Sequence, residues 1–237
     1  MLEPALVAAI MLLAGVVKGV VGLGLPTVAI GFLGMMMPLA SAIALLLLPT
    51  LATNAAQAFG RPIGPVLRRI WPMLAGVVTG TFAGSGFLGA EWAPRVLGCV
   101  LLAYAAMGLA GFNPRLPLRA ERWTAFPAGL TSGLIAAATG VFVLPVAPWL
   151  QAIRMPRDEL IQALGLFFTV GLVSLGALLA LSGALWEVPL VNTAAAFAGA
   201  FAGLWVGARI RHRLSQAAFV RVLFAALGGL GLWLIVS

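Results

Sequence analysis

The sequence predicts an all-α integral membrane protein, in which eight hydrophobic units form two inverted four-unit repeats and the first and fifth units are broken or re-entrant. Three observations support this prediction. The 237-residue chain is 62% hydrophobic and 8% charged, whereas soluble domains carry about 25% charged residues. Its apolar runs have the length, roughly 17 to 25 residues, that spans a bilayer. Finally, glycine and proline features recur in the same order in both halves.

The apolar runs define the units in chain order. They cover 5–21 with 27–37, 38–59, 70–89, 94–111, 123–138 with 141–153, 158–182, 188–208 and 217–236. The N-terminus carries Glu3 and no basic residue before the first run, so we interpret it as a retained segment rather than a cleaved signal peptide. The lone Cys99 lies in an apolar run and excludes an intrachain disulfide.

The repeats are indicated by four features in register. The first unit reads GVVKGVVGLG from Gly15, and the fifth reads GLTSGLIAAATG from Gly129. A Met-Pro pair follows each, and Arg-Val-Leu opens the fourth and eighth units. Glycines at four-residue spacing occupy the third and seventh units, at Gly76, Gly80, Gly84, Gly199, Gly203 and Gly207. We therefore divide one membrane domain, 1–237, into repeats 1–113 and 114–237, and expect these glycines, with Gly15, Gly19, Gly129 and Gly133, to serve close helix packing.

The basic residues predict how the units cross the membrane. The formal net charge is +8, but nearly all arginines lie in short links between apolar runs, which favours the positive-inside rule over nucleic-acid binding. If all units crossed the membrane, the link 209–213 (Arg209, Arg211, Arg213) would lie on the opposite side from the links 60–69 and 112–122. If the first and fifth units instead return to the side they entered, all these links and 154–157 face the cytoplasm. Three crossings per repeat then remain, so the second repeat is inverted.

The length of the first unit agrees with a broken hairpin. Residues 5–37 would measure about 50 Å as one helix, which is long for one crossing of a roughly 30 Å core and short for two. Inverted repeats with broken helices are typical of transporters, with the substrate near the midplane at the breaks. The sequence therefore predicts a transporter with a midplane site.

Lys18 lies one turn before the first break. Free backbone N–H groups at the start of the following half-helix carry partial positive charge and favour an anion. A lysine at membrane depth costs about 3 kcal/mol on insertion scales, and the predicted membrane interior contains no Asp or Glu. A bound anion is therefore a candidate partner, and snorkelling of Lys18 toward an interface is the alternative.

Other polar residues near the breaks complete the candidate site. Thr50, Thr53, Asn54 and Gln57 share one helix face after Pro49, where Asn54 would either join helices or contact a ligand. The candidate substrate-binding residues are Lys18, Gly22, Gly24, Thr27, Asn54, Gln57, Thr139 and Gly140. We expect no catalytic residue, metal site or cofactor. Tryptophans at segment ends predict interfacial anchors, at Trp71, Trp92, Trp123, Trp149 and Trp186.

The two glycine-rich stretches, GVVKGVVGLGLP and GLTSGLIAAATGVFVLP, resemble the duplicated signatures of the TauE/SafE sulfite exporter family, also called the 4-toluene sulfonate uptake permease family. The resemblance covers essentially the whole chain, although the final glycines of the usual G-x-x-G-x-G-G-G pattern are replaced here. It implies a bacterial inner-membrane permease for sulfite or organosulfonate anions. Phe142 and Trp149, near the second break, would then hold an organic tail.

Three other function classes are alternatives to an anion carrier. A rhomboid-type protease is disfavoured because Ser85 lies in AGSG and the only histidine, His212, lies in a basic link. An anion channel, or a transporter of another solute such as an amino acid, is not separated from an anion carrier by the sequence. Expected partners are a small anionic substrate and the lipid bilayer, without nucleic acid. The glycine ladders permit a homo-oligomer without requiring one.

Overall fold

A computed structural model describes residues 2–22, 24–59, 63–112, 114–212 and 215–236 of the chain. Within these residues the secondary structure is helical, without strands, which confirms the predicted all-α class. Arg61 and Arg213, which we assigned to cytoplasmic links, lie outside the described residues.

The two halves contain helices in the same order of long, short and three long elements. The first half has α1 (Pro4–Val21), α2 (Leu25–Leu33), α3 (Leu39–Ala58), α4 (Ile63–Ala83), a 3-10 turn (Ser85–Phe87) and α5 (Ala93–Leu109). The second half has α6 (Leu118–Thr139), α7 (Val146–Ala152), α8 (Arg157–Ser182), a 3-10 turn (Ala184–Glu187), α9 (Leu190–Ile210) and α10 (Gln216–Val236). The largest departure from the expected ranges is in the third unit. We expected it at 70–89, whereas α4 begins and ends earlier, at Ile63–Ala83.

Five helices in the described part are long and apolar enough to cross a membrane. They are α1, α3, α8, α9 and residues Ala218–Val236 of α10. The shorter α5 is also apolar. The chain is therefore a multi-pass helical membrane protein.

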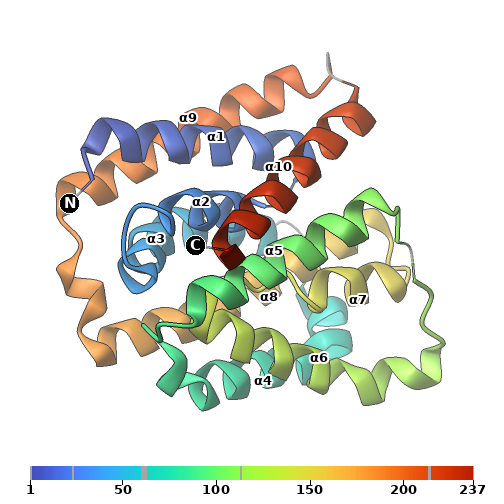
Figure 1. Ribbon diagram of the computed structural model, residues 1–237. Helices are drawn as coiled ribbons and strands as arrows, with labels where there is room; N and C mark the ends of the chain where they lie inside the picture. Colours follow the sequence, from blue (N-terminus) through green and yellow to red (C-terminus); the bar gives the residue numbers. More distant parts are fainter. Residues whose placement is uncertain (1, 23, 60–62, 113, 213–214, 237) are drawn as a thin grey trace.

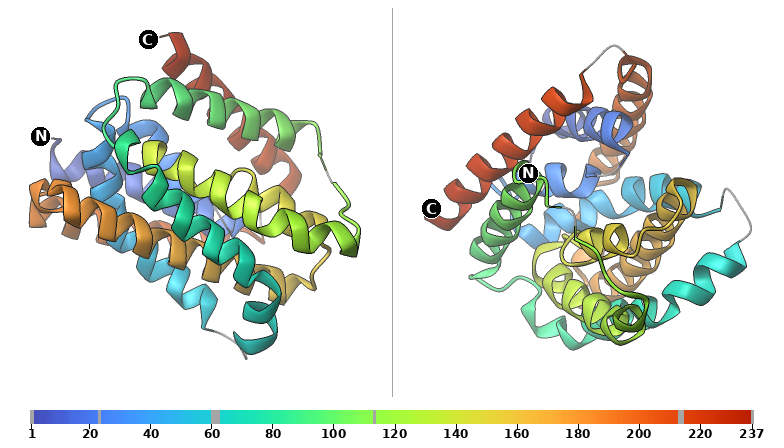
Figure 2. Two further views of the ribbon diagram at one scale, coloured as in Figure 1. Left: turned by 90° about the horizontal axis from the view of Figure 1, so that it is seen from below. Right: turned by 90° about the vertical axis from the view of Figure 1, so that its right-hand side faces the viewer.

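The helices pack in pairs that join the two halves. Helix α1 lies along α9, α4 lies along α6, α5 lies along α10, and α3 lies along α8. In Figures 1 and 2 the α1/α9 and α4/α6 pairs flank the molecule, and α3 and α8 lie between them, joined by α3–α9 and α4–α8 contacts. Exchanging α1–α5 with α6–α10 turns α1/α9 into α6/α4 and leaves α5/α10 and α3/α8 unchanged.

Glycines allow the flanking pairs to approach closely. A Cβ atom at Gly203 in α9 would meet the carbonyl oxygen of Leu12 in α1, and one at Gly80 in α4 would meet that of Leu130 in α6. The same holds for Gly15, Gly19, Gly199 and Gly207 in the first pair and for Gly76, Gly129 and Gly133 in the second. The predicted packing role of these glycines is confirmed.

The segment α6–α7 begins and ends at the same end of the bundle. The backbone N–H of Leu116, just before α6, donates to the carbonyl oxygen of Ala152, the last residue of α7, at 3.1 Å. Arg69, near the start of α4, lies at the same end of the bundle and contacts both ends of this segment. Its guanidinium donates to both carboxylate oxygens of Glu121, at 2.6 and 2.9 Å, and to the carbonyl oxygen of Ile153, at 3.0 Å. This hairpin is therefore closed by direct hydrogen bonds.

The segment α1–α2 is closed at its own two ends in a similar way. Leu2, Met37 and Glu187 surround one cavity of about 400 Å³, so the residue before α1 lies near the residues after α2. The side-chain amide of Asn192, at the start of α9, donates to the carbonyl oxygen of Leu2 at 3.3 Å. Asn192 precedes its glycine ladder by seven residues, as Arg69 does. Corresponding positions of the two halves therefore contact corresponding hairpins, Arg69 at both ends of α6–α7 and Asn192 at the start of α1–α2.

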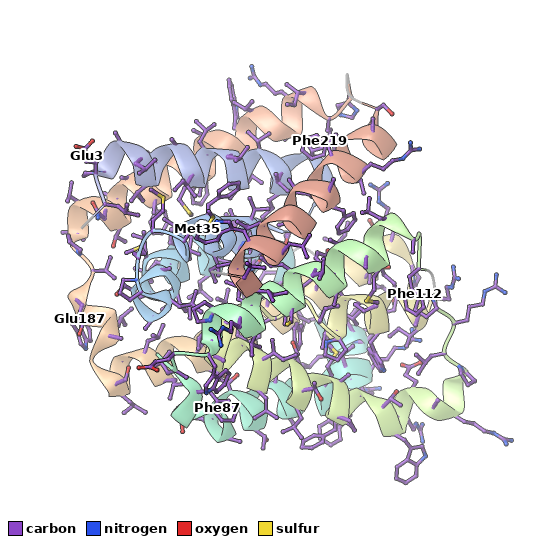
Figure 3. The ribbon with its side chains drawn as sticks, in the orientation of Figure 1. Glu3, Met35, Phe87, Phe112, Glu187 and Phe219 are labelled. Carbon is purple, nitrogen blue, oxygen red and sulfur yellow. The ribbon has the colours of Figure 1, made fainter. Side chains whose placement is uncertain are left out.

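Figure 3 places Glu3 and Glu187 at one end of the bundle and Phe112 toward the other. We call these the acidic end and the basic end. Phe112 shares a cavity with Arg154, and further basic residues of the links gather in a neighbouring cavity, namely Arg157, Arg211 and His212. The arginine-rich links that we expected on one side thus lie at one end of the described structure.

Candidate anion site

The first helix break is made by glycines in the left-handed region of the backbone. Helix α1 ends at Gly22, with φ of 91°, and α2 follows Gly24, with φ of 102°. Such φ angles favour glycine because other side chains are strained there. The N–H of Gly22 donates to the carbonyl oxygen of Lys18 at 2.7 Å, and Pro26 occupies the first turn of α2, as is common at a helix start.

Lys18 is buried against α3. Its side chain is 3% exposed, and its ammonium group donates to Thr53 Oγ1 at 3.0 Å and to Asn54 Oδ1 at 2.5 Å. The side chain therefore turns into the protein, and the snorkelling alternative is not what the structure shows. We refer to Lys18, Thr50, Thr53 and Asn54 as the Lys18 cluster.

The groups left over in the Lys18 cluster are mainly hydrogen-bond donors. An ammonium group has three N–H bonds, and the structure uses two of them. The Thr53 hydroxyl donates to the Thr50 carbonyl oxygen at 3.0 Å. Within the described part of the chain, Asn54 Nδ2 and Thr50 Oγ1 are buried without a partner. A ligand that completes this cluster must therefore accept hydrogen bonds.

With Lys18 protonated, the cluster also carries a positive charge. Lys18 forms no ion pair with a carboxylate of the described residues. A buried charge without an opposite charge is costly, and the carbonyl end of α1, in whose last turn Lys18 lies, offsets only part of that cost. An anion suits both the charge and the free donors.

A cavity of about 600 Å³ at the basic end borders the first break. Gly22 and Gln57 line it, together with Arg157 and Arg211. The side-chain amide of Gln57 donates to the Gly22 carbonyl oxygen at 3.1 Å. Because Gln57 lies about one turn beyond Asn54 on α3, this hydrogen bond lies next to the Lys18 cluster.

The second break satisfies its own polar groups. The hydroxyl of Thr139 donates to the Ile135 carbonyl oxygen at 2.7 Å and accepts the N–H of Val141 at 3.2 Å. Ser132 occupies the place in GLTSG that Lys18 has in GVVKG, and its hydroxyl donates to the Phe142 carbonyl oxygen at 2.6 Å. This break therefore carries neither a buried charge nor free donors from these residues.

Of the candidate residues, the structure brings Lys18, Gly22, Asn54 and Gln57 together around the first break. Gly24 lies beside the Val17 side chain, to which an added Cβ would come within 3.7 Å. Thr27, in the first turn of α2, is buried.

Thr139 and Gly140 lie at a different place. Gly140, with φ of 71°, packs against Ile30 and Ile43. Ile43 precedes Asn54 by 11 residues on α3, or about 16 Å along a helix. The two breaks therefore contact different levels of α3.

Two features of the site were missed or misassigned from sequence. Thr53 is a direct partner of Lys18, although the sequence placed it only on the same helix face as Asn54. Trp149 is not an interfacial anchor, because it is 6% exposed and its indole N–H donates to Thr124 Oγ1 at 2.8 Å. The other predicted anchors are exposed, at Trp71, Trp92, Trp123 and Trp186.

The fold and this site define a class: a multi-pass helical membrane protein with paired broken helices and a buried, donor-rich cation. The family model described as Sulfite exporter TauE/SafE matches residues 7–234, so the chain belongs to this family of membrane transporters of sulfite-type anions. No curated protein and no solved structure matches the chain.

Proposed function

We propose that this protein carries a sulfur oxyanion, sulfite or an organosulfonate, across the bacterial inner membrane, with the Lys18 cluster as its binding site. The observation that carries the proposal is the surplus of buried donors beside an unpaired ammonium group. The SO₃ group of sulfite or a sulfonate offers three oxygens that accept hydrogen bonds. Membership of the TauE/SafE family supports an anion of this kind.

The basic-end cavity supplies the route to the site in this proposal. Arg157 and Arg211 line it, and clefts lined by one sign of charge concentrate ions of the other sign. In this proposal Gly22 and Gln57, which line the cavity, form its mouth toward Lys18, and Gly24 and Thr27 complete the substrate site. For Thr139 and Gly140 to contact the anion directly, the α6–α7 hairpin must move toward the cluster.

We also propose that the halves 1–113 and 114–237 are inverted repeats that rock against each other, with the basic end in the cytoplasm. The exchange symmetry of the helix pairs supports this. So does the closure of α1–α2 at the acidic end and of α6–α7 at the basic end. Rocking of inverted repeats around a fixed site gives alternating access.

Thermal shift of the purified protein tests the substrate class and the site together. A ligand that binds the folded state stabilises it by mass action, by about 2.7 kcal/mol at 100 times its Kd. We expect sulfite, sulfoacetate or 4-toluenesulfonate to raise the melting temperature of the unaltered protein but not of Lys18→Met. The matched control is Arg115→Gln, which removes an exposed charge outside the cluster.

Two results would overturn the proposal. Stabilisation by amino acids or carboxylates, with none by sulfur oxyanions, would reject the substrate class. An undiminished shift in Lys18→Met would remove Lys18 from the site.

A further inference from the structure

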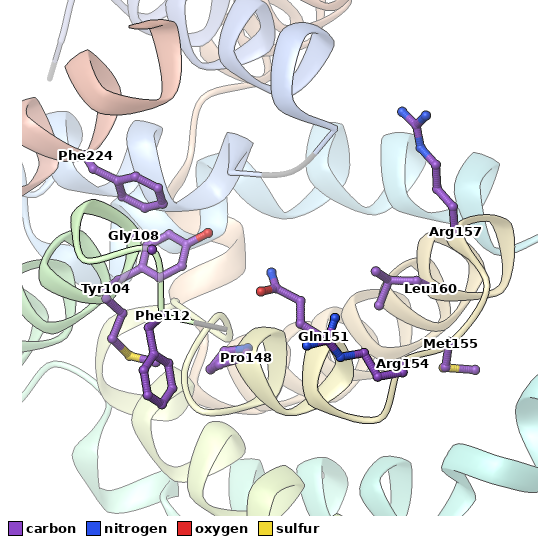
Figure 4. Close-up of a pocket in the computed structure, with 12 residues that line it drawn as sticks. Tyr104, Gly108, Phe112, Pro148, Gln151, Arg154, Met155, Arg157, Leu160 and Phe224 are labelled. Atoms are coloured by element: carbon purple, nitrogen blue, oxygen red, sulfur yellow. The ribbon is translucent and has the colours of Figure 1, made fainter. Parts of the chain in front are cut away.

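A second cavity at the basic end lies apart from the Lys18 cluster, between the pair α5/α10 and the segment α7–α8. Its volume is about 570 Å³. Figure 4 shows aromatic side chains on one side of it and an amide and two guanidinium groups on the other. We call it the aromatic–arginine pocket, defined by Tyr104, Phe112, Gln151, Arg154, Arg157 and Phe224.

The aromatic side of this pocket is a packed wall. The rings of Tyr104 and Phe224 meet edge to face, with centroids 5.1 Å apart and planes at 81°. Gly108 makes room for this contact, because a Cβ there would meet the ring carbons of Phe224. The wall joins α5 to α10 and presents aromatic rings, with the Tyr104 hydroxyl, to the pocket.

The polar side contains a residue in an unfavourable backbone conformation. Arg154, in the link between α7 and α8, has φ of 52°. A non-glycine residue in the left-handed region is strained, and Asn or Gly would adopt this conformation more readily. The chain nevertheless has an arginine there, with an exposed side chain. Such local cost is frequent where a side chain serves a ligand.

The charge and surroundings of the pocket favour an amphipathic anion as its ligand. Arg154 and Arg157 line it, and no Asp or Glu of the described residues is among the lining side chains. The surface at the end of α5 beside it is apolar and exposed, with Leu109 at 52% and Phe112 at 54%. An amphipathic molecule whose anionic headgroup lies at the arginines would therefore have its apolar part against a surface suited to acyl chains.

We propose that the aromatic–arginine pocket binds the phosphate headgroup of an anionic phospholipid, whose acyl chains lie along α5 and α10. Basic pockets between transmembrane helices on the cytoplasmic side bind such headgroups. The bound lipid would hold the α5/α10 pair against the α7–α8 link. This inference rests on the proposed orientation, with the basic end in the cytoplasm. The pocket shares no residue with the Lys18 cluster, but Arg157 also lines the proposed route to that cluster, so the test below uses Arg154.

Native mass spectrometry of the purified protein tests the proposal directly. We expect phosphatidylglycerol to remain bound in preference to phosphatidylcholine. Arg154→Asn, which removes the charge but suits the left-handed backbone, should weaken phosphatidylglycerol binding about fivefold, because a basic residue near an anionic lipid contributes about 1 kcal/mol. Arg154→Lys should keep most of the affinity. Arg122→Asn, an exposed arginine at the same end but outside the pocket, should change little.

Three outcomes would overturn it: equal retention of the two lipids, unchanged binding in Arg154→Asn, or inorganic phosphate displacing phosphatidylglycerol at comparable concentration, which would indicate a site for free anions. Lys18→Met is expected to keep the lipid preference. A negative result for Lys18→Met in the anion-binding experiment therefore does not affect the lipid test. A negative result in the lipid test likewise does not affect the proposed anion site.

Discussion

The position of Lys18 has both a structural and a ligand-binding interpretation at the scale of single residues. A cation in the last turn of α1 interacts favourably with the helix dipole, and two side chains of α3 accept its hydrogen bonds. These contacts fasten α1 to α3 with or without a ligand. The unpartnered amide nitrogen of Asn54 calls for a further acceptor, either an anion or a water molecule, and substitutions at Asn54 therefore separate the two interpretations.

Asn54→Asp should weaken anion binding while preserving the fold. The new carboxylate would pair with Lys18 and replace the donor of the amide by an acceptor that repels an anion. Because a hydrogen bond to a charged group contributes about 1.5–3 kcal/mol, we expect sulfite affinity to fall at least about tenfold, with an unchanged or higher melting temperature. Isothermal titration and thermal melting measure the two quantities. Retained affinity in this variant would place the anion elsewhere.

Ser132→Ala gives the matching experiment in the second half. The buried hydroxyl of Ser132 holds the Phe142 carbonyl oxygen, so its loss should lower the free energy of unfolding by about 1 kcal/mol. Anion affinity should not change, since Ser132 binds its own hairpin. A loss of affinity comparable with that of Lys18→Met would show that both breaks hold the anion.

At the scale of helices, the glycine ladders set the distance between α1 and α9 and between α4 and α6. Gly80→Ala should be destabilising, by about 1–3 kcal/mol, as expected for overpacking, because its Cβ would meet the Leu130 carbonyl oxygen. Gly64→Ala is the control in the same helix: nothing lies within 4 Å of its added Cβ. It should be neutral or slightly stabilising, given the higher helix propensity of alanine. Melting of both variants in detergent compares them, and equal melting temperatures would argue against the close approach.

Much of the helical structure could be predicted from the sequence. Apolar runs gave the helices, and GVVKGVVGLGLP located the break, because glycine and proline restrict the backbone locally. The residues that join distant segments were harder to foresee. The contact of Lys18 with Thr53 and Asn54 spans 35 and 36 positions, and no local pattern specifies which face of α3 meets α1.

Trp149 illustrates the same limit. Its place at the end of an apolar run is typical of an interfacial anchor, but α7 is a short helix inside the protein, and its indole finds Thr124 on α6. The position of a side chain along its segment indicates depth only when that segment faces the lipid. Similarly, arginines in links indicated the side of the membrane but not the cavities that they line.

At the scale of the whole molecule, the proposed topology has two hairpins that open to opposite sides. Accessibility of single cysteines in a Cys99→Ser background tests it. Glu3→Cys, Met36→Cys and Glu187→Cys, all exposed residues near the acidic end, should react with a membrane-impermeant maleimide from outside the cell. His212→Cys should react only after permeabilisation. Labelling of Glu3→Cys and Met36→Cys from opposite sides would mean that the first unit crosses the membrane completely.

The central claim is that this chain moves a sulfur oxyanion through a site that depends on Lys18. The most direct measurement is sulfite flux into proteoliposomes containing either the unaltered protein or Lys18→Met, at equal reconstituted amounts. The account predicts saturable flux that organosulfonates inhibit, and its loss in Lys18→Met while the melting temperature is maintained. Equal sulfite flux in both proteins, or transport of amino acids without any flux of sulfite or sulfonates, would contradict it.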